Sequence, residues 1–465
     1  MLRKLTVVLL SAGALALGAC SSDSTQPANL CTGVTAPCVA FPTGTAAATI
    51  TSAIATAAAN TTFIFGSGTF AFNNTLTLPK VSGLTINGAG IDATILDFST
   101  QTAGAGGILG ADATNNITFA NFTIQNTKGD GIKIVGATGV TFNYVKVTWT
   151  SSDLTSHGAY ALYPVQSSNV LVQNCQVIGS RDAGIYVGQS SKIIVRNNKV
   201  TSSVAGIEIE ASSDADVYGN EASGNTGGLL VFTLPGLQVH STSKIHVYNN
   251  NIHDNNLLNF ADPSGTVYAI PAGTGIVVMA SSTVEVNGNT IANNRTAAYA
   301  VITYCLVATT DPTCGTAGDP LFNPFPSNVY AHNNTFTNNG YSPATTQNDG
   351  NANQLGLLLY GLQSGGAFGT TGTAKNPVPA LIWDGIAPIP PYVPPPGAAP
   401  TNPLGYWIGS NGTTAVFVNL NFPVLIPGGN PANLDPTALQ FDPTVFTAAT
   451  APAGFPLPAV VIPGA

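Results

Sequence analysis

The chain has 465 residues, of which only 7% are charged, and its 21 acidic against 13 basic side chains give a formal net charge of −8. Because acidic side chains outnumber basic ones, the chain lacks the excess of positive charge that nucleic-acid-binding proteins use to bind phosphate groups. The low charged fraction also argues against a chain that is disordered because its charges repel one another. The abundance of small and neutral polar residues instead favours a β-rich body large enough to bury a sizeable core.

The first twenty residues resemble a bacterial lipoprotein signal peptide. Two basic residues precede an apolar stretch, Leu5 to Leu17, which is too short to span a bilayer. The following Leu17-Gly18-Ala19-Cys20 resembles a lipobox, which implies cleavage before Cys20 and lipidation of its thiol. An ordinary signal peptide with a chance cysteine is the alternative. We therefore expect residues 1–19 to be a signal peptide and the mature chain to be anchored in the cell envelope by lipid, without spanning the membrane.

The rest of the chain divides by composition into three parts. Residues 20–44 begin with a Ser, Thr, Gln, Pro and Asn stretch from Ser21 to Asn29 and are expected to form a lipidated tether. Residues 45–365 are expected to form the folded domain. Residues 366–465 hold most of the prolines, 19 of the 32 from Pro377 onward, and are expected to form a C-terminal cap or strap that cannot continue a sheet. A fully disordered tail is the alternative.

Four cysteines form two close pairs. Cys31 and Cys38 lie in the tether, and Cys305 and Cys314 enclose a loop of Thr, Asp, Pro and Gly. In an oxidising compartment such pairs predict loop-closing disulfides. Zinc is disfavoured because no histidine or second cysteine pair stands at ligand spacing, so we expect no metal and no cofactor.

A repeat runs through the central part of the chain. Each unit begins with an alternating apolar run, turns on Asn, and closes with Gly and a second alternating run. Starts are spaced by 30, 23, 22, 30, 39 and 45 residues, at Val140, Val170, Ile193, Ala215, Ile245, Val284 and Val329. A period near 22 with variable insertions is typical of a β-solenoid. We therefore predict an all-β, right-handed parallel β-helix of about ten coils.

The alternation also predicts which side chains face the core. The inward pairs are expected to be Ile132/Ile134, Leu162/Pro164, Ile185/Val187, Ile207/Ile209, Leu229/Val231, Ile276/Val278 and Leu357/Leu359. The sixth position of successive units is Asn198, Asn220, Asn250, Asn289 and Asn334, which predicts a stacked column of amides. Cys175 occupies that position one unit earlier and is expected to be a buried, unreactive thiol that caps the column.

The N-terminal end of the solenoid needs a cover. The Ala-rich stretch from Ala46 to Ala59 follows Thr45, a possible N-cap, and is expected to form a capping helix. Two or three further coils are expected between Thr62 and Ala113.

One face of the middle coils gathers much of the scarce charge and aromatic character. Outward positions carry Lys133, Tyr163, Tyr186 and Glu208 in one column and Glu210 and Phe232 in the next, and Gly188 is expected to leave a notch. The predicted binding residues are Asp130, Lys133, His157, Tyr160, Tyr163, Arg181, Asp182, Tyr186, Gln189, Glu208, Glu210 and Phe232. Elongated sugars suit such a face, so we expect it to bind a polysaccharide or another cell-envelope partner.

Catalysis on this face is an alternative. A polysaccharide lyase or C5-epimerase would use Tyr163 or Tyr186 as acid or base and Arg181 or Lys133 to neutralise a uronate carboxylate. In a glycosidase, Glu208 and Glu210 would act with α-carbons about 6.6 Å apart.

Each of these residues also has a purely structural interpretation. The tyrosines could simply stack, the glutamates could be solvated charges, Arg181 could pair with Asp182 or Glu208, and His157 could be a loop residue.

Several stretches resemble a family of bacterial parallel β-helix repeat proteins whose biochemical role is undetermined. The resemblance covers about residues 50–363 and is carried by Gly158–Gln166, Asp182–Gln189, Val204–Glu210, Asn225–Phe232, Asn259-Phe260 and Pro271–Gly275. It implies the β-helix fold and a second exported protein as a partner.

The chain departs from known patterns in several places. His157 stands where the family usually has Asn, Ala161 where it has Gly, and Thr233 where it has Asp. The Asp-Pro-His-Asp motif of alginate epimerases is not matched, since Asp262-Pro263 continues as Ser264-Gly265, and the polygalacturonase motifs do not occur. These departures lower the expectation of a known β-helix activity.

Overall fold

The protein is described from a computed structural model covering residues 30–34, 37–112, 114–308, 311, 313–364, 376–386, 402, 404–412, 415–425, 435 and 438–464. The predicted signal peptide and Cys20 lie outside these residues.

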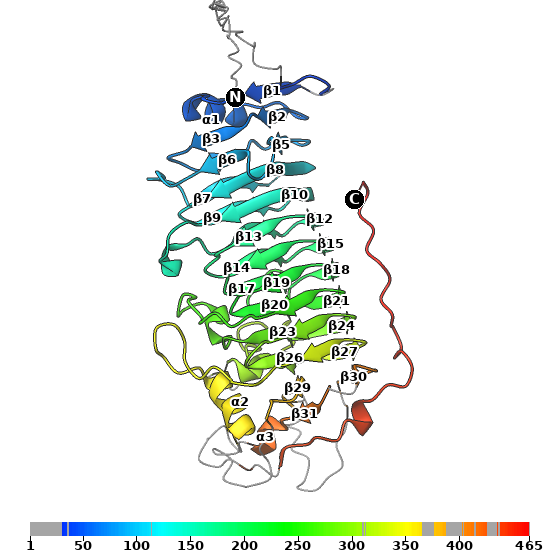
Figure 1. Ribbon diagram of the computed structural model, residues 1–465. Coiled ribbons are helices and arrows are strands. Elements are labelled where there is room, and N and C mark those ends of the chain that lie inside the picture. Colours follow the sequence, from blue (N-terminus) through cyan, green and yellow to red (C-terminus); the bar gives the residue numbers. More distant parts are fainter. Residues whose placement is uncertain are drawn as a thin grey trace, which may run out of the picture.

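The described chain winds into a parallel β-helix whose coils stack along one axis (Figure 1). One sheet, here called sheet B, has eleven described strands: β4 (Leu76–Thr77), β7 (Gly106–Ala111), β9 (Asp130–Val135), β11 (Leu162–Val165), β14 (Ala183–Gly188), β17 (Ala205–Glu210), β20 (Gly227–Phe232), β23 (Thr274–Met279), β26 (Ala297–Ile302), β29 (Leu381–Trp383) and β31 (Phe417–Asn419). All pairings between these strands are parallel.

The other sheet, sheet A, forms the remaining sides of the coils. Its described strands are β1 (Cys38–Phe41), β2 (Thr62–Phe65), β3 (Gly68–Ala71), β5 (Thr85–Asn87), β6 (Thr94–Asp97), β8 (Ile117–Gln125), β10 (Thr138–Thr148), β12 (Ser168–Gln173), β13 (Gln176–Ile178), β15 (Ser191–Arg196), β16 (Lys199–Thr201), β18 (Ser213–Tyr218), β19 (Glu221–Ser223), β21 (Thr242–Tyr248), β22 (Asn251–His253), β24 (Ser281–Asn287), β25 (Thr290–Ala292), β27 (Ser327–His332), β28 (Thr335–Thr337) and β30 (Tyr406–Ile408). The predicted all-β, parallel β-helix is confirmed.

The register places like side chains over one another in the core. Ile185, Ile207, Leu229 and Ile276 are paired in successive coils of sheet B, and all are fully buried. The repeat starts are in register as well, for example Val170 with Ile193 and Ala215. Stacking about 4.8 Å apart lets each aliphatic side chain bury its surface against the coils above and below.

One predicted core pair is wrong. Leu357 and Leu359 lie on helix α2 (Gln354–Ser364), and Leu357 is exposed. Residues two apart lie on different sides of a helix, so Leu359 is buried while Leu357 is exposed. The coil that they were expected to form uses residues of β29 instead.

The asparagine column is confirmed and is longer than predicted. Each amide nitrogen donates to the next amide oxygen at 2.9–3.0 Å, from Asn198 through Asn334 and on to Asn411. A second ladder, which the sequence analysis missed, joins Asn225, Asn255, Asn294 and Asn339 at 2.9–3.1 Å. Cys175 lies at the end of the first ladder, where its backbone N–H donates to Asn198, and burial raises the pKa of its thiol to about 12.

Helix α1 (Ala47–Ala55) lies at the N-terminal end of the β-helix and buries Ile50 and Ile54 (Figure 1). Its N-cap is Ala46, without a side-chain hydrogen bond, and not Thr45 as expected. Disulfides join Cys31 to Cys38 and Cys305 to Cys314, as predicted.

The C-terminal region corrects another expectation. Despite its prolines it continues both sheets, because β29 pairs with β26, β30 with β27, and β31 with β29. The prolines lie outside these three-residue strands, so they remove no donor from the ladders. The remaining helical segments are α3 (Phe422–Leu425) and the 3-10 turns η1 (Leu154–Ser156), η2 (Thr266–Ala269), η3 (Tyr304–Leu306) and η7 (Thr444–Phe446).

Candidate functional site

The predicted column lies on the outer face of sheet B. Tyr163 is in register with Lys133, and Tyr186 with Glu208, which in turn neighbours Leu230. The pairing of Leu162 with Ile185 places Tyr163 beside Tyr186. Residues about 22 to 30 positions apart in sequence are therefore side by side because the coils stack in register.

Three tyrosines form a cluster on this face. The ring centroids of Tyr160, Tyr163 and Tyr186 are 4.5–4.8 Å apart. The Lys133 ammonium lies 4.4 Å from the centre of the Tyr163 ring, where the negative face of the ring attracts it. The same ammonium is 3.8 Å from Asp130 and its side chain is 36% exposed, so a positive charge remains accessible beside the aromatic rings.

Carboxyl groups lie beneath the tyrosines. Glu208 is only 1% exposed and Glu210 only 5%, so the interpretation of both as solvated surface charges is wrong. Burial raises the pKa of Glu210 to about 7 and that of Asp182 also to about 7, and it raises the pKa of Glu208 well above its usual value. One oxygen of Glu208 and one of Asp182 are buried without a hydrogen-bond partner in the described structure.

Gly188 does not leave the expected notch. The Tyr186 side chain lies over Gly188, where any Cβ would overlap its ring and hydroxyl, and the hydroxyl donates a hydrogen bond to Glu210. Because a hydroxyl bonded to a carboxylate is held in its neutral form, this contact and burial together raise the Tyr186 pKa. Because residue 188 is a glycine, the Tyr186 ring has the space to lie over it and to place its hydroxyl group against the Glu210 carboxyl group.

Arg181 marks the edge of the site and bonds to a residue far away in sequence. Its guanidinium donates to Asp262 at 2.9 Å, so the suggested pairing with Asp182 or Glu208 is not the ion pair that forms. No sequence pattern indicates this contact, since the two residues are 81 positions apart.

Other predicted residues have different surroundings. His157 is buried and stacks on Trp149, and its ring nitrogens Nδ1 and Nε2 lie 2.6 and 2.9 Å from the carbonyl oxygens of Gly179 and Ser151, which gives it a structural role. The Gln189 side chain accepts a hydrogen bond from the Gln238 N–H at 3.0 Å.

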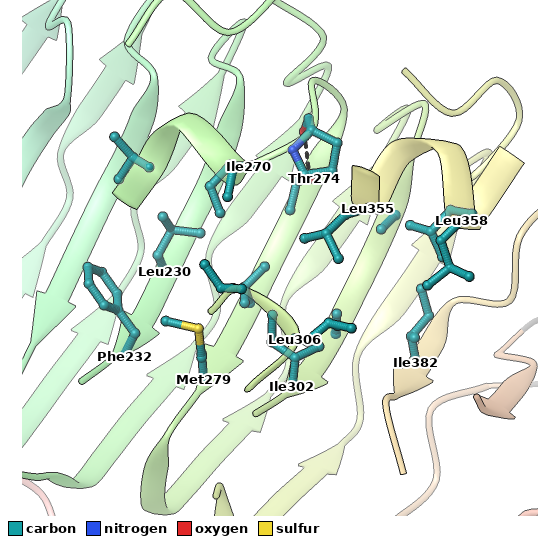
Figure 2. Close-up of a pocket in the computed structure, with 18 of the residues that line it drawn as sticks. Leu230, Phe232, Ile270, Thr274, Met279, Ile302, Leu306, Leu355, Leu358 and Ile382 are labelled. Carbon is teal, nitrogen blue, oxygen red and sulfur yellow. Dashed lines mark hydrogen bonds between the residues drawn. The ribbon is translucent and has the colours of Figure 1, made fainter. Parts of the chain in front are cut away.

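Phe232 belongs to an apolar part of the same face. From β20 onward the outward residues of sheet B are Leu230, Val277, Ala300 and Ile382. Helix α2 and the turns η2 and η3 cover them and leave an apolar cavity of about 70 Å³ between Phe232, Met279 and Leu355 (Figure 2). The sheet B face thus changes from polar to apolar between two neighbouring coils.

The site combines partly exposed aromatic and charged side chains with carboxyl groups that are buried beneath them. The partly exposed layer offers the rings of Tyr160 and Tyr163, the Lys133 ammonium and the Arg181–Asp262 pair. Tyr186, which is only 4% exposed, lies in the buried layer with the carboxyl groups of Asp182 and Glu210, whose pKa values burial raises to about 7. Within the described residues no group of three or more His, Cys, Asp or Glu side chains has the arrangement of a metal site. The described helices include none long and apolar enough to cross a membrane.

A comparison with protein-family models identifies the fold of the central part of the chain. Residues 138–310 and 235–356 match the family model described as "Right handed beta helix region". No curated protein matches the chain. The predicted resemblance to right-handed parallel β-helix proteins is therefore confirmed at the level of the fold.

Several solved structures are similar to the chain. The chain is similar to the A-module of the mannuronan C-5 epimerase AlgE4 from Azotobacter vinelandii, with 17% identity, a TM-score of 0.46, and coverage of 72% of this chain and 89% of that one. It is also similar to endopolygalacturonase I from Stereum purpureum, with 15% identity, a TM-score of 0.37, and coverage of 65% and 95%. At such identities the likeness concerns the fold alone.

Proposed function

We propose that this right-handed parallel β-helix protein binds a polysaccharide of the cell envelope on the outer face of sheet B. The observation that carries the proposal is the pair of partly exposed rings of Tyr160 and Tyr163, which pack on the buried Tyr186 and have the Lys133 ammonium at their edge. Aromatic rings contact the apolar faces of sugars, and an accessible ammonium pairs with a sugar carboxylate or donates hydrogen bonds to sugar hydroxyl groups.

The remaining predicted features complete the proposal. The lipobox-like sequence before Cys20 supports export and a lipid anchor in the cell envelope, and the family resemblance supports a second exported protein as a partner. Metabolic labelling with palmitate tests the anchor: the wild-type chain should take up the label and Cys20→Ser should abolish it, and a wild-type chain without label would contradict the anchor.

Glycan binding is tested directly with the purified chain on a panel of acidic and neutral polysaccharides. We expect Tyr163→Ala to weaken binding at least tenfold because it removes one aromatic face from the cluster. The matched control is Tyr144→Ala, because Tyr144 is 50% exposed but lies on β10 of sheet A. Equal binding by both variants would contradict the assignment to this face.

A uronate lyase or C5-epimerase is the second candidate, favoured by the hydrogen bond between Tyr186 and the buried Glu210. Such a pair is suited to move a proton to or from a sugar carbon, with Lys133 neutralising the carboxylate. New absorbance from unsaturated sugar ends would show a lyase, and NMR of the recovered polymer would show epimerisation. Release of reducing ends alone would instead indicate hydrolysis through Glu208 and Glu210.

A further inference from the structure

A second polar column lies on the outer face of sheet A, which the proposed glycan site does not use. Asp216 on β18, His246 on β21, Glu285 on β24 and Tyr330 on β27 are in register, one in each successive coil. Asp216 is 3% exposed and Glu285 1% exposed, which is unusual for carboxylates on the outside of a sheet. Something must therefore cover them.

Imidazoles accompany these carboxylates. The two ring nitrogens of His246 lie 3.9 Å from Asp216 Oδ1 and 3.9 Å from Glu285 Oε2, and His332 Nε2 lies 2.9 Å from Glu285 Oε1. Asp216 Oδ1 is nevertheless buried without a hydrogen-bond partner among the described residues. The column thus contains at least one carboxylate oxygen, Asp216 Oδ1, that could accept a hydrogen bond from a ligand.

The cover is the C-terminal segment of the chain, residues 455–461, here called the strap. In Figure 1 the C-terminal residues run back along the outside of the coils toward the N-terminal end. The backbone N–H of Leu457 donates to Glu285 Oε2 at 2.7 Å, and that of Val460 donates to Asp216 Oδ2 at 2.9 Å. The ring of Phe455 packs 5.5 Å from that of Tyr330.

The distance between the two bonded N–H groups of the strap matches the distance between the two carboxylates that accept from them. Leu457 and Val460 are three residues apart, which spans about 10 Å in an extended chain. Their acceptors lie two coils apart, on β24 and β18, which is about 9.6 Å along the axis. An extended peptide running along the axis therefore presents N–H groups at the spacing of carboxylates in alternate coils, whatever its side chains are.

We propose that this column is a peptide-binding groove, with the strap as its resident ligand and an extended, uncharged segment of a partner protein as the ligand that replaces it. Because the groove binds backbone N–H groups, the sequence of the ligand can vary. The one side chain that the strap suggests is an aromatic residue two positions before the first bonded N–H, as Phe455 is to Leu457. The strap adds no strand to either sheet, and residues 449–451 before it are exposed, so its departure leaves the coils intact.

The charges of the groove define the class of peptide. Asp216 and Glu285 would repel an acidic ligand, and Lys192 at the edge would repel a strongly basic one. The nearby Lys244 and Asp214 form an ion pair with each other at 3.5 Å. The strap meets both conditions, because no residue after Asp442 is charged. A cavity of about 330 Å³ remains between the strap and the sheet, which leaves room for larger side chains than those of Leu457 to Val461.

The test uses the complete folded chain with a protease recognition sequence inserted after Thr450. Cleavage after folding leaves the strap held without a covalent link, so a fluorescein-labelled peptide of residues 451–465 can exchange with it. We expect saturable binding to the cleaved chain and binding at least tenfold weaker to the uncleaved chain, where the tethered strap competes at high effective concentration. Equal binding to both would show that the strap does not occupy the groove.

Modified peptides then test the mode of recognition without changing the protein. N-methylation of Leu457 or of Val460 removes one donated N–H, and each change should weaken binding at least tenfold because charge-assisted hydrogen bonds are lost. N-methylation of the exposed Ala459 is the matched control and should change affinity less than twofold. Equal effects of all three methylations would overturn the proposal. Glu285→Ala in the chain, with its fold checked by thermal unfolding, removes the acceptor; it should weaken binding of the unmodified peptide and make binding insensitive to methylation at Leu457.

Discussion

Tyr186 lies across Gly188 and donates its hydroxyl to Glu210, so that two residues on neighbouring strands are joined over a position without a side chain. The arrangement requires all three residues. Without glycine the ring would have no space, and without the ring the carboxyl group would lose its hydrogen bond and part of its cover.

Gly188→Ala should displace Tyr186 and destabilise the fold by about 1–3 kcal/mol, because the added methyl group overlaps the ring. Urea unfolding measures the change in the free energy of unfolding. In a Tyr186→Ala background the same substitution should cost much less, since the overlap is gone, and the difference is the coupling energy between the two positions. Gly318→Ala serves as the control, because the nearest atom to its Cβ would be 3.8 Å away. Additive effects of the two substitutions would contradict the arrangement.

The raised pKa values of the buried carboxyl groups predict that stability falls as pH rises. Glu210 has a pKa of about 7 in the folded chain against 4.5 for an unperturbed glutamate, so between these values the folded state binds more protons than the unfolded state. The free energy of unfolding should therefore be highest below about pH 4.5, decrease up to about pH 7, and level off above it. Asp182 acts in the same direction, and the loss for Glu210 alone is on the order of 3 kcal/mol.

Glu210→Gln should flatten this decrease in urea unfolding measured from pH 4 to pH 8. The control is Glu221→Gln, because a hydrogen bond from Lys199 lowers the pKa of Glu221 and its contribution has the opposite sign. This control should leave the decrease between pH 4.5 and 7 in place. A wild-type stability that rises over this range would refute the assignment.

Asn250→Ala should be among the most destabilising single changes in the coils. Its amide nitrogen donates to Asn289 and to the Val217 carbonyl, and its amide oxygen accepts from Asn220, all at 2.9–3.0 Å. Truncation leaves these buried partners without a hydrogen bond, which costs about 2–4 kcal/mol. Asn251→Ala changes the exposed neighbour and should cost less than about 0.5 kcal/mol. Similar urea midpoints for the two variants would contradict a structural role of the ladder.

The fold could be predicted because each coil of a β-helix places the same kinds of side chain at equivalent positions. The spacing of Val170, Ile193 and Ala215 gave the register, and the recurring asparagines gave the ladder, since each position contacts its equivalent in the next coil. The same logic placed Tyr163, Tyr186 and Glu208 on one face. Burial of Glu208 could not be predicted, because its cover comes from side chains and loops outside the repeat.

Contacts made by insertions and by the C-terminal region were missed for the same reason. No period relates Arg181 to Asp262, or Val460 to Asp216, which are 244 residues apart. The sheet A column did carry a signal, since Asp216, His246 and Glu285 all occupy the second position of their repeat unit. Its polar character in three consecutive coils was as unusual as that of the sheet B face.

The apolar cavity between sheet B and helix α2 leads to a last prediction, which compares two alanines on β26. Ala300 lines the cavity, so Ala300→Val should fill part of it and raise the free energy of unfolding by about 1 kcal/mol. Ala298 lies in the main core, and Ala298→Val should lower the free energy of unfolding by about 1–3 kcal/mol because packed neighbours leave no room. Urea unfolding of both variants measures the difference. Destabilisation by Ala300→Val of the same size as by Ala298→Val would mean that α2 already packs tightly against the sheet and that no cavity exists there.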